Sequence, residues 1–204
     1  MKKRKRAERL QANERRAVTV QAVIELAAEQ NPAEITTSAM AERMHMTQGA
    51  LFRHFATKDA IWQEVMDWVA ERLMTRVDKA VQAAGSPLEA LEAVFLAHID
   101  FVVQHAGAPR ILFGELQRPG DTSAKRVART LLTRYGERIQ ALIEQGKSQG
   151  KLSSDIDTTV AVTLFIGTIQ GLVMQSLLTG KGGDIRAMAP KIFAIYLRGI
   201  RSVQ

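Results

Sequence analysis

Four residues between positions 48 and 53 are suited to contact nucleic-acid bases, two by hydrogen bonding and two by their small size. Gln48 can form two hydrogen bonds with adenine, and Arg53 can form two with guanine or bind a phosphate. Gly49 and Ala50, which lie between them, are small enough for the backbone to approach base edges and a thymine methyl group. This combination predicts a surface that reads the major groove of DNA.

Two threonines flank this stretch, and each can cap the start of a helix. Thr47 precedes a helix expected over 48–54, and Thr57 precedes a longer helix expected over 58–80. Backbone N–H groups at a helix start bind anions, and Lys58 stands beside the second cap. We therefore expect both helix starts to contact phosphates of the DNA backbone.

The elements around these residues predict a helix-turn-helix. A helix over 37–45, a short turn and the helix over 48–54 have the spacing of that motif, but both helices are too short to be stable alone. A preceding helix, ending at the "QNP" of 30–32, supplies an apolar face for them. The side chains expected to point inward are Met40, Ala41, Met44, Met46, Leu51 and Phe55.

Most of the excess positive charge lies at the N-terminus. The chain of 204 residues has a formal net charge of +7, and residues 1–16 contain eight basic and two acidic residues, a net charge of +6. Such a segment is expected to be attracted to a polyanion, although a solvated tail would have the same composition. The segment lacks the apolar stretch of a secretory signal.

The remaining sequence predicts helices throughout. The expected ranges are 86–105, 109–117, 122–149, 155–178 (capped by the "SSD" at 153–155) and 185–201, and no stretch alternates as a strand would. We therefore predict an all-α fold with a basic arm over 1–15, a three-helix DNA-binding domain over 16–57 and a C-terminal helical bundle over 58–204.

The stretch "ITTSAMAERMHMTQGALFRHFATKDAIW", 35–62, resembles the DNA-binding segment of TetR-type transcriptional regulators. The resemblance covers about 45 residues, 18–62, and "GKLSSDIDTTVAVTLFIGTIQGL" at 150–172 is more weakly similar to the family's dimer-forming region. The matching positions are Ile35, Met40, Ala41, Thr47, Gly49, Leu51, His54, Phe55, Lys58 and Asp59. The DNA-contacting residues expected from the motif are Thr36, Thr37, Ser38, Thr47, Gln48, Gly49, Ala50, Phe52, Arg53, His54 and Lys58.

Three positions depart from the family pattern. His45 stands where the family usually has glycine, so a residue with a side chain has to adopt a positive φ in the turn. Phe52 replaces the usual tyrosine and has no hydroxyl for a phosphate, and Ala50 replaces a common threonine. These changes concern individual contacts and leave the expected docking mode unchanged.

The resemblance implies an all-helical homodimer that binds a palindromic operator and releases it when a small molecule enters the C-terminal domain. Aromatic and aliphatic walls with a few amide or imidazole groups suit a mostly apolar effector with one or two polar atoms. The residues expected to bind it are Phe95, His98, Ile99, Phe113, Gln117, Phe165, Ile169, Gln170 and Met174.

Residues 158–180 contain no charge and are long enough to cross a bilayer, yet several polar side chains within them would lack partners in lipid. We instead expect a helix buried on two sides, which packs against the core and against a second copy of the chain. The residues predicted at that dimer interface are Gly167, Gly171, Ile185, Met188, Ile192, Ile195 and Gly199.

Catalytic and metal-binding patterns are weak. The "GKS" at 146–148 lacks the upstream glycine of a phosphate-binding loop, and His98 and His105, seven residues apart, are too few ligands for a metal site. The absence of cysteine excludes thiolate sites. The sequence thus predicts no enzyme activity, no metal and no cofactor.

We therefore expect a cytoplasmic, homodimeric DNA-binding regulator, a repressor that responds to a small molecule. The two alternatives are a small-molecule-binding protein that has lost DNA binding and a regulator anchored to the membrane through 158–180.

Overall fold

The computed structural model describes residues 2–180 and 184–202, with side chains described over 15–180 and 185–202. Helices account for most of this part of the chain, and its only β-type pairing is an isolated bridge between Leu152 and Arg201. The predicted all-α fold is confirmed. The chain forms two compact units, one from residues up to Ala70 together with His105–Arg129, the other from Glu71–Gln104 together with the chain from Thr130 onward.

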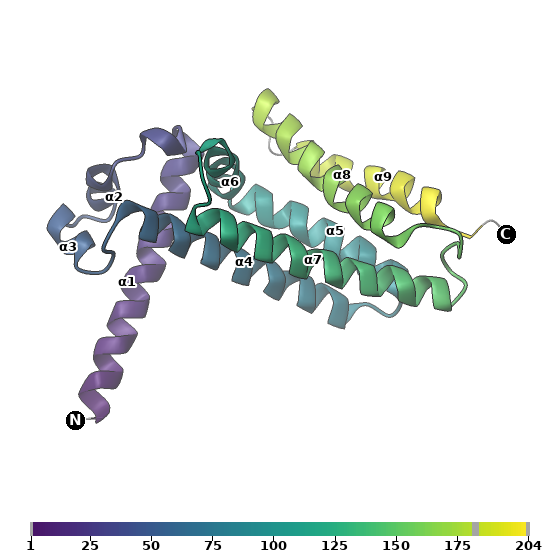
Figure 1. Ribbon diagram of the computed structural model, residues 1–204, viewed down its shortest axis with the longest axis horizontal. Helices are drawn as coiled ribbons and strands as arrows, with labels where there is room; N and C mark the ends of the chain where they lie inside the picture. Colours follow the sequence, from purple (N-terminus) through teal and green to yellow (C-terminus); the bar gives the residue numbers. More distant parts are fainter. Residues whose placement is uncertain (1, 181–183, 203–204) are drawn as a thin grey trace. The chain divides into compact units, whose positions relative to one another are not determined.

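The first unit contains four whole helices, parts of two others and a short 3-10 turn (Figure 1). They are α1 (Lys2–Glu29), η1 (Pro32–Glu34), α2 (Thr37–Arg43), α3 (Gln48–Phe52), the first half of α4 (Lys58–Ala83), α6 (Gly107–Gln117) and the start of α7 (Ser123–Ser148). Besides the residues of the predicted 16–57 domain, this unit takes in the start of α4, all of α6 and the start of α7. The sequence predicts these helices but not η1.

The N-terminal segment continues the first helix. The sequence predicts a basic arm over 1–15 that is separate from the first helix. In the structure, α1 is continuous from Lys2 and includes this segment. The reason is compositional, since residues 2–15 lack glycine and proline and are rich in lysine, arginine, glutamate and alanine, which favour helices.

Glycine at position 107 allows α1 and α6 to pack in direct backbone contact. A Cβ atom built on Gly107 would lie 1.9 Å from the carbonyl oxygen of Ile24 and 3.0 Å from the amide nitrogen of Ala28. Because both neighbours are backbone atoms, they cannot move aside as a flexible side chain could. Gly107 therefore fixes how closely the two helices approach.

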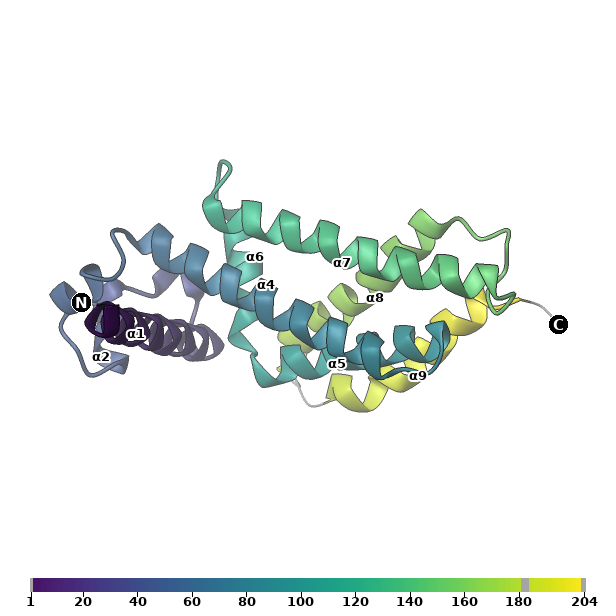
Figure 2. The same cartoon turned by 90° about the horizontal axis from the view of Figure 1, so that it is seen from below.

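The second unit is a helical bundle. It contains the rest of α4, α5 (Pro87–Gln104), most of α7 (Ser123–Ser148), α8 (Thr158–Thr179) and α9 (Asp184–Ile200), and α5, α8 and α9 pack on one another (Figure 2). Its core is a cluster of aromatic rings, in which Phe95 meets Phe165 edge to face at 5.5 Å between ring centroids and Phe193 at 5.4 Å. The Tyr196 hydroxyl donates to the Ala161 carbonyl at 3.1 Å and so ties α9 to α8.

Two helix ends in this unit are set by single residues. Gly150 adopts the left-handed conformation with φ of 65° after α7, where helices commonly end on glycine. The "SSD" cap was wrong, since α8 begins at Thr158 and its cap is Asp157, whose carboxylate accepts from the Val160 amide at 3.0 Å. Aspartate is as good a cap as serine, so both the "SSD" segment and Asp157 have residue types that can cap the start of α8.

Gly146, the glycine of the "GKS" segment, lies within α7 and has a packing role. A Cβ atom there would lie 2.7 Å from Cδ1 of Leu152, so the glycine lets the turn after α7 fold back onto the helix. Lys147 is also engaged locally, because its ammonium donates to the Ile156 carbonyl at 2.9 Å. Gly146 and Lys147 are thus engaged in packing and hydrogen bonding within the chain.

Candidate nucleic-acid interface

The turn between α2 and α3 has the geometry of a helix-turn-helix (Figure 1). His45 has φ of 52°, which confirms the prediction that a residue other than glycine adopts positive φ here. Its amide donates to the Glu42 carbonyl at 2.9 Å, and the Met46 amide donates to the Ala41 carbonyl at 3.0 Å. These bonds satisfy the end of α2 and reverse the chain toward α3.

The helices α2, α3 and α4 each begin after a threonine cap, and the caps at Thr47 and Thr57 confirm the prediction. The hydroxyls of Thr36, Thr47 and Thr57 accept hydrogen bonds from the amides three residues ahead at 3.1, 3.2 and 3.1 Å. Caps of this kind stabilise a helix by about 1 kcal/mol each, a large share for helices as short as α2 and α3.

The inner face of the motif is apolar. Met40, Ala41, Leu51 and Phe55 are buried, as predicted, whereas Met44 and Met46 are only partly so. Both methionines lie at the turn, on either side of the exposed His45.

The outer face of α3 carries the residues predicted to read bases. Gln48, Gly49 and Arg53 are exposed, and Ala50 and His54 are partly exposed. A Cβ atom built on Gly49 would have no atom within 4 Å, so no packing inside this chain requires the glycine. Phe52 also faces outward, with 41% of its surface exposed. The predicted contacts on α2 are accessible too, with Thr36 and Ser38 exposed and Thr37 partly exposed.

A hydrogen bond between the two helices was not anticipated from the sequence. The side-chain amide of Gln48 donates to the Thr37 hydroxyl at 2.5 Å. One amide hydrogen and the carbonyl oxygen of Gln48 are left for other partners, which is the pair that adenine requires. Thr37 thus orients Gln48. The signal in the sequence was a threonine at the start of one helix and a glutamine at the start of the next.

Ion pairs hold the motif against its supporting helices. Arg43 at the end of α2 pairs with Glu29 of α1 through two nitrogens, one at 3.0 Å, and approaches Glu25 at 3.7 Å. The hydrogen bonds from Arg43 lower the pKa of the Glu29 carboxyl. Arg16 of α1 lies 3.4 Å from Glu64 of α4 and 6.0 Å from the centre of the Phe55 ring. Because Arg43 is engaged in this way, it positions the motif.

Lys58 is the free cation at the start of α4. Its ammonium lies 5.8 Å from the centre of the Trp62 ring, and within the described part of the chain it forms no ion pair with a carboxylate. An ammonium in this state can bind a phosphate without first breaking a salt bridge.

The residues predicted to bind an effector fall into three groups. Phe95, Ile99, Phe165 and Ile169 are buried in the second unit, whereas Gln170 and Met174 lie exposed on the outer face of α8. Phe113 and Gln117 lie on α6, in the first unit, with Gln117 exposed.

His98 brings a polar group to the aromatic core of the second unit. Its Nδ1 lies 3.1 Å from the Tyr135 hydroxyl, and the two rings meet edge to face. Loss of solvation lowers the pKa of His98 to about 4 and raises the pKa of the Tyr135 hydroxyl. Both groups are therefore neutral at physiological pH. His105, its candidate partner for a metal, instead packs against Trp68 in the first unit.

The outer faces of α8 and α9 expose an apolar surface. Large apolar side chains are exposed on both helices. The space next to Gly167 and Gly171 of α8 is open, since a Cβ atom on either glycine would meet nothing within 4 Å. Met188, Ile192, Ile195 and Gly199 are partly or fully exposed along α9, whereas Ile185 is buried in the chain's own core and is not available to a partner. The exposed large side chains on this surface, which we call the α8–α9 face, are Val160, Leu164, Met174, Leu178, Met188 and Ile195.

The helix α8 is also long and apolar enough to span a membrane by length and composition alone. Its inner side packs in the core of the second unit, where Phe165, Ile169 and Leu172 are buried. Gln170 and Gln175 are exposed on its other side, where lipid would leave their amides without hydrogen-bond partners. The helix therefore has the features of a core helix with one open face.

Comparison with known proteins identifies the class. Residues 20–65 match the family of bacterial regulatory proteins of the TetR type, and residues 84–174 match a tetracyclin-repressor-like C-terminal domain. The chain belongs to the TetR family of DNA-binding transcriptional regulators.

Individual relatives are distant. The chain is 26% identical over 165 residues to the nucleoid occlusion factor SlmA of Marinomonas sp. (strain MWYL1), covering 79% of this chain and 82% of that protein. Among solved structures, the ketosteroid transcriptional regulator KstR2 of Mycobacterium tuberculosis is similar with a TM-score of 0.77 and 21% identity, covering 93% of this chain and 96% of that one. FadR of Bacillus subtilis, solved with stearoyl-CoA, is similar with a TM-score of 0.79 and 17% identity, covering 91% and 99%. At these identities the structures establish the fold.

Proposed function

We propose that this regulator is a cytoplasmic homodimeric repressor that binds a palindromic operator and is released by a small, mostly apolar effector. The observation that carries the DNA-binding part is the outer face of α3, where exposed Gln48 and Arg53 flank a glycine that the chain's own packing does not need. Each subunit would place α3 in a major groove, about one helical turn from that of its partner.

Base reading would fall to three residues of α3. Gln48, oriented by Thr37, would bind adenine, Arg53 would bind guanine, and Ala50 would meet a thymine methyl group. Phosphate contacts would come from the helix starts after Thr47 and Thr57 and from Lys58, and these would fix register without specifying sequence. The exposed Phe52 ring would contribute apolar contact in place of the hydroxyl that a tyrosine would offer.

Selection of bound sites from random duplex DNA tests this proposal. A palindromic consensus would support both the target class and the two-fold symmetry. Gln48→Ala and Arg53→Ala should each relax preference at a defined base pair and cost about 1–3 kcal/mol. If both weaken binding equally on all sequences, the residues contact only phosphate. A protein that selects no sequence would instead be a small-molecule-binding protein that has lost DNA binding.

Deletion of residues 2–6 tests the contribution of the basic segment. It removes five positive charges, so affinity should depend less steeply on salt while operator preference is kept. An unchanged slope would show that these charges do not reach the DNA.

The α8–α9 face supports a dimer. It is apolar, it includes two glycines that would let a partner helix approach closely, and in a dimer it would form a four-helix interface. Gly167→Leu adds a side chain into space that is open in one chain and occupied in the proposed dimer. Sedimentation should then show monomers with unchanged helix content. A variant that remains dimeric would place the interface elsewhere.

The effector would bind in the second unit. Support comes from the buried aromatic cluster around Phe95 and Phe165 and from the neutral His98–Tyr135 pair, which can offer a hydrogen bond inside apolar surroundings. An effector that binds better to a form with wrongly spaced reading helices would shift the population off DNA. The helix α4 contributes residues to both units and is the proposed connection, with α6 pushing on it.

A further inference from the structure

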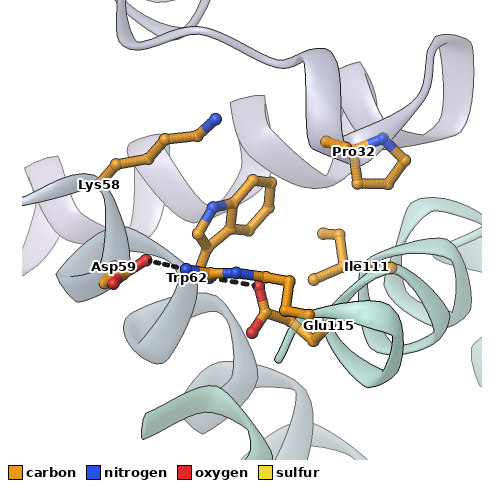
Figure 3. A pocket seen from close by; sticks show the side chains of 9 residues that line it. Pro32, Lys58, Asp59, Trp62, Ile111 and Glu115 are labelled. Carbon is orange, nitrogen blue, oxygen red and sulfur yellow. Dashed lines mark hydrogen bonds and ion pairs between the residues drawn. The ribbon is translucent and has the colours of Figure 1, made fainter. Parts of the chain in front are cut away.

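A pocket in the first unit adjoins the proposed DNA-binding surface and shares Lys58 with it. It is formed by η1, the first turns of α4 and the second half of α6, and its volume is about 250 Å³ (Figure 3). An enclosed space of about 150 Å³ is enough to hold benzene. The pocket therefore has room for a small aromatic molecule with one substituent.

The walls of the pocket are largely apolar. Figure 3 shows the Trp62 indole at the centre, with Pro32 and Ile111 on one side. Gly114 of α6 completes this wall, and a Cβ atom built on it would lie 3.6 Å from Cβ of Pro32, an ordinary contact distance. The absence of a side chain at position 114 therefore keeps this part of the pocket open without being required by the fold.

The carboxylates of the pocket already have hydrogen-bond or ion-pair partners within the chain. Glu115 is buried, and it accepts hydrogen bonds from Arg118 at 2.8 Å and from the Thr122 hydroxyl at 2.9 Å. The same Arg118 guanidinium lies 3.0 Å from Asp59. A buried carboxylate with these partners does not need a cationic ligand.

Lys58 is the remaining charge, and it stands on the other side of Trp62 (Figure 3). Its ammonium has no carboxylate partner among the described residues, and it lies over an aromatic ring, so it can bind an anion at the mouth of an apolar pocket. We propose that this pocket binds a small aromatic carboxylate, with the ring between Trp62, Pro32 and Gly114 and the carboxylate on the Lys58 ammonium.

Such a ligand would act differently from an effector in the second unit. Its carboxylate would occupy the ammonium that we assign to a DNA phosphate, so it would compete with operator directly. This consequence rests on the proposed function, whereas binding of the carboxylate does not.

Benzoate is the test ligand, and neutral benzamide of nearly the same shape is its control. In a Trp68→Phe background, Trp62 is the single indole, and its fluorescence can be excited at wavelengths where benzoate does not absorb. Without DNA and at constant ionic strength, benzoate should change the emission saturably with a dissociation constant of about 1–10 mM, as expected for so few atoms. Benzamide should bind at least about tenfold more weakly.

Variants locate the site. Lys58→Gln should remove the difference between benzoate and benzamide. Gly114→Leu should weaken both ligands at least about tenfold, Gly114→Ala should have a smaller effect in the same direction, and the matched helical control Gly136→Ala should bind as the parent does. Far-UV circular dichroism checks that each variant is folded, and Gly114→Ala, which introduces only an ordinary contact, is expected to fold in any case.

Absence of saturable binding, equal binding of the two ligands, or unchanged binding in a folded Gly114→Leu protein would each overturn the proposal. Operator affinity is then measured with and without benzoate. If benzoate binds but leaves operator affinity unchanged, the result supports the ligand pocket and contradicts the proposed contact between Lys58 and a DNA phosphate.

Discussion

Addition of one methyl group at position 49 tests how closely the backbone of α3 approaches DNA. In the free protein, a Cβ atom at Gly49 would meet nothing within 4 Å, so Gly49→Ala cannot clash inside the chain. Alanine is favoured over glycine within helices by about 1 kcal/mol, and less in a first turn. We therefore expect Tm to stay the same or rise by about 1–2 °C.

The effect on DNA binding should have the opposite sign. A methyl group forced into a close-packed contact costs about 1–3 kcal/mol, which corresponds to a loss of affinity of roughly 5- to 150-fold for each subunit that docks. Fluorescence anisotropy with operator and with an unrelated duplex measures this loss, and the loss should be larger on operator because only there is α3 seated on base edges.

The control for this experiment is Gly136→Ala in α7, where the added Cβ would make one ordinary contact, 3.7 Å from Val162. That variant should bind operator as the parent does. If Gly49→Ala also binds operator with unchanged affinity, the backbone of α3 does not lie against the bases, and the assignment of this face as the reading surface is wrong.

Three further predictions concern stability. His45→Gly should stabilise the first unit by about 0.5–1 kcal/mol, because the relief of a left-handed conformation at φ of 52° outweighs the greater entropy of glycine in the unfolded chain; a lower urea midpoint would contradict this. Gly107→Ala should destabilise it by about 1–3 kcal/mol, since the new Cβ would lie 1.9 Å from a backbone oxygen of α1, and an unfolding curve that matches the parent's would refute the close contact. The pKa of His98 is lowered to about 4 in the folded chain. As pH falls from about 6.5 toward 4, His98 binds a proton in the unfolded chain but not in the folded chain. The free energy of unfolding should therefore decrease by up to about 3 kcal/mol over this range. Urea titrations over that pH range give the free energy of unfolding, which should fall more steeply with decreasing pH for the parent than for His98→Phe. The same pH dependence in both proteins would contradict the lowered pKa of His98.

The sequence was most informative where one physical rule acts locally. Thr47 and Thr57 cap helices as predicted, because a threonine hydroxyl before a helix-forming stretch accepts a hydrogen bond from a free backbone amide of the first turn. The positive φ of His45 was expected from the resemblance to the TetR family, in which glycine usually stands at this position, and the structure confirms it. The exposure of Gln48, Gly49 and Arg53 on the outer face of α3 also agrees with the prediction.

Features that depend on distant residues were missed. The sequence does not show that Gly107 would meet the backbone of α1, or that Arg118 would join Asp59 and Glu115 beside a pocket. The predicted dimer interface shows the same limit, because Ile185 fits a heptad with Ile192 and Ile195 as well as it fits the core. Only the packing of α9 on its neighbours decides between the two faces, and it buries Ile185.

The end of α9 is fastened to the turn between α7 and α8. The Leu152–Arg201 bridge, the bond from the Ser153 amide to the Ile200 carbonyl at 3.1 Å and the bond from the Ser202 hydroxyl to the Gly150 carbonyl at 3.2 Å all lie there. These contacts hold the end of α9 against the residues that precede α8, so fraying of either helix at this end would also loosen the other. Shortening the chain by a few residues after Leu197 would therefore unfasten both helices of the α8–α9 face together.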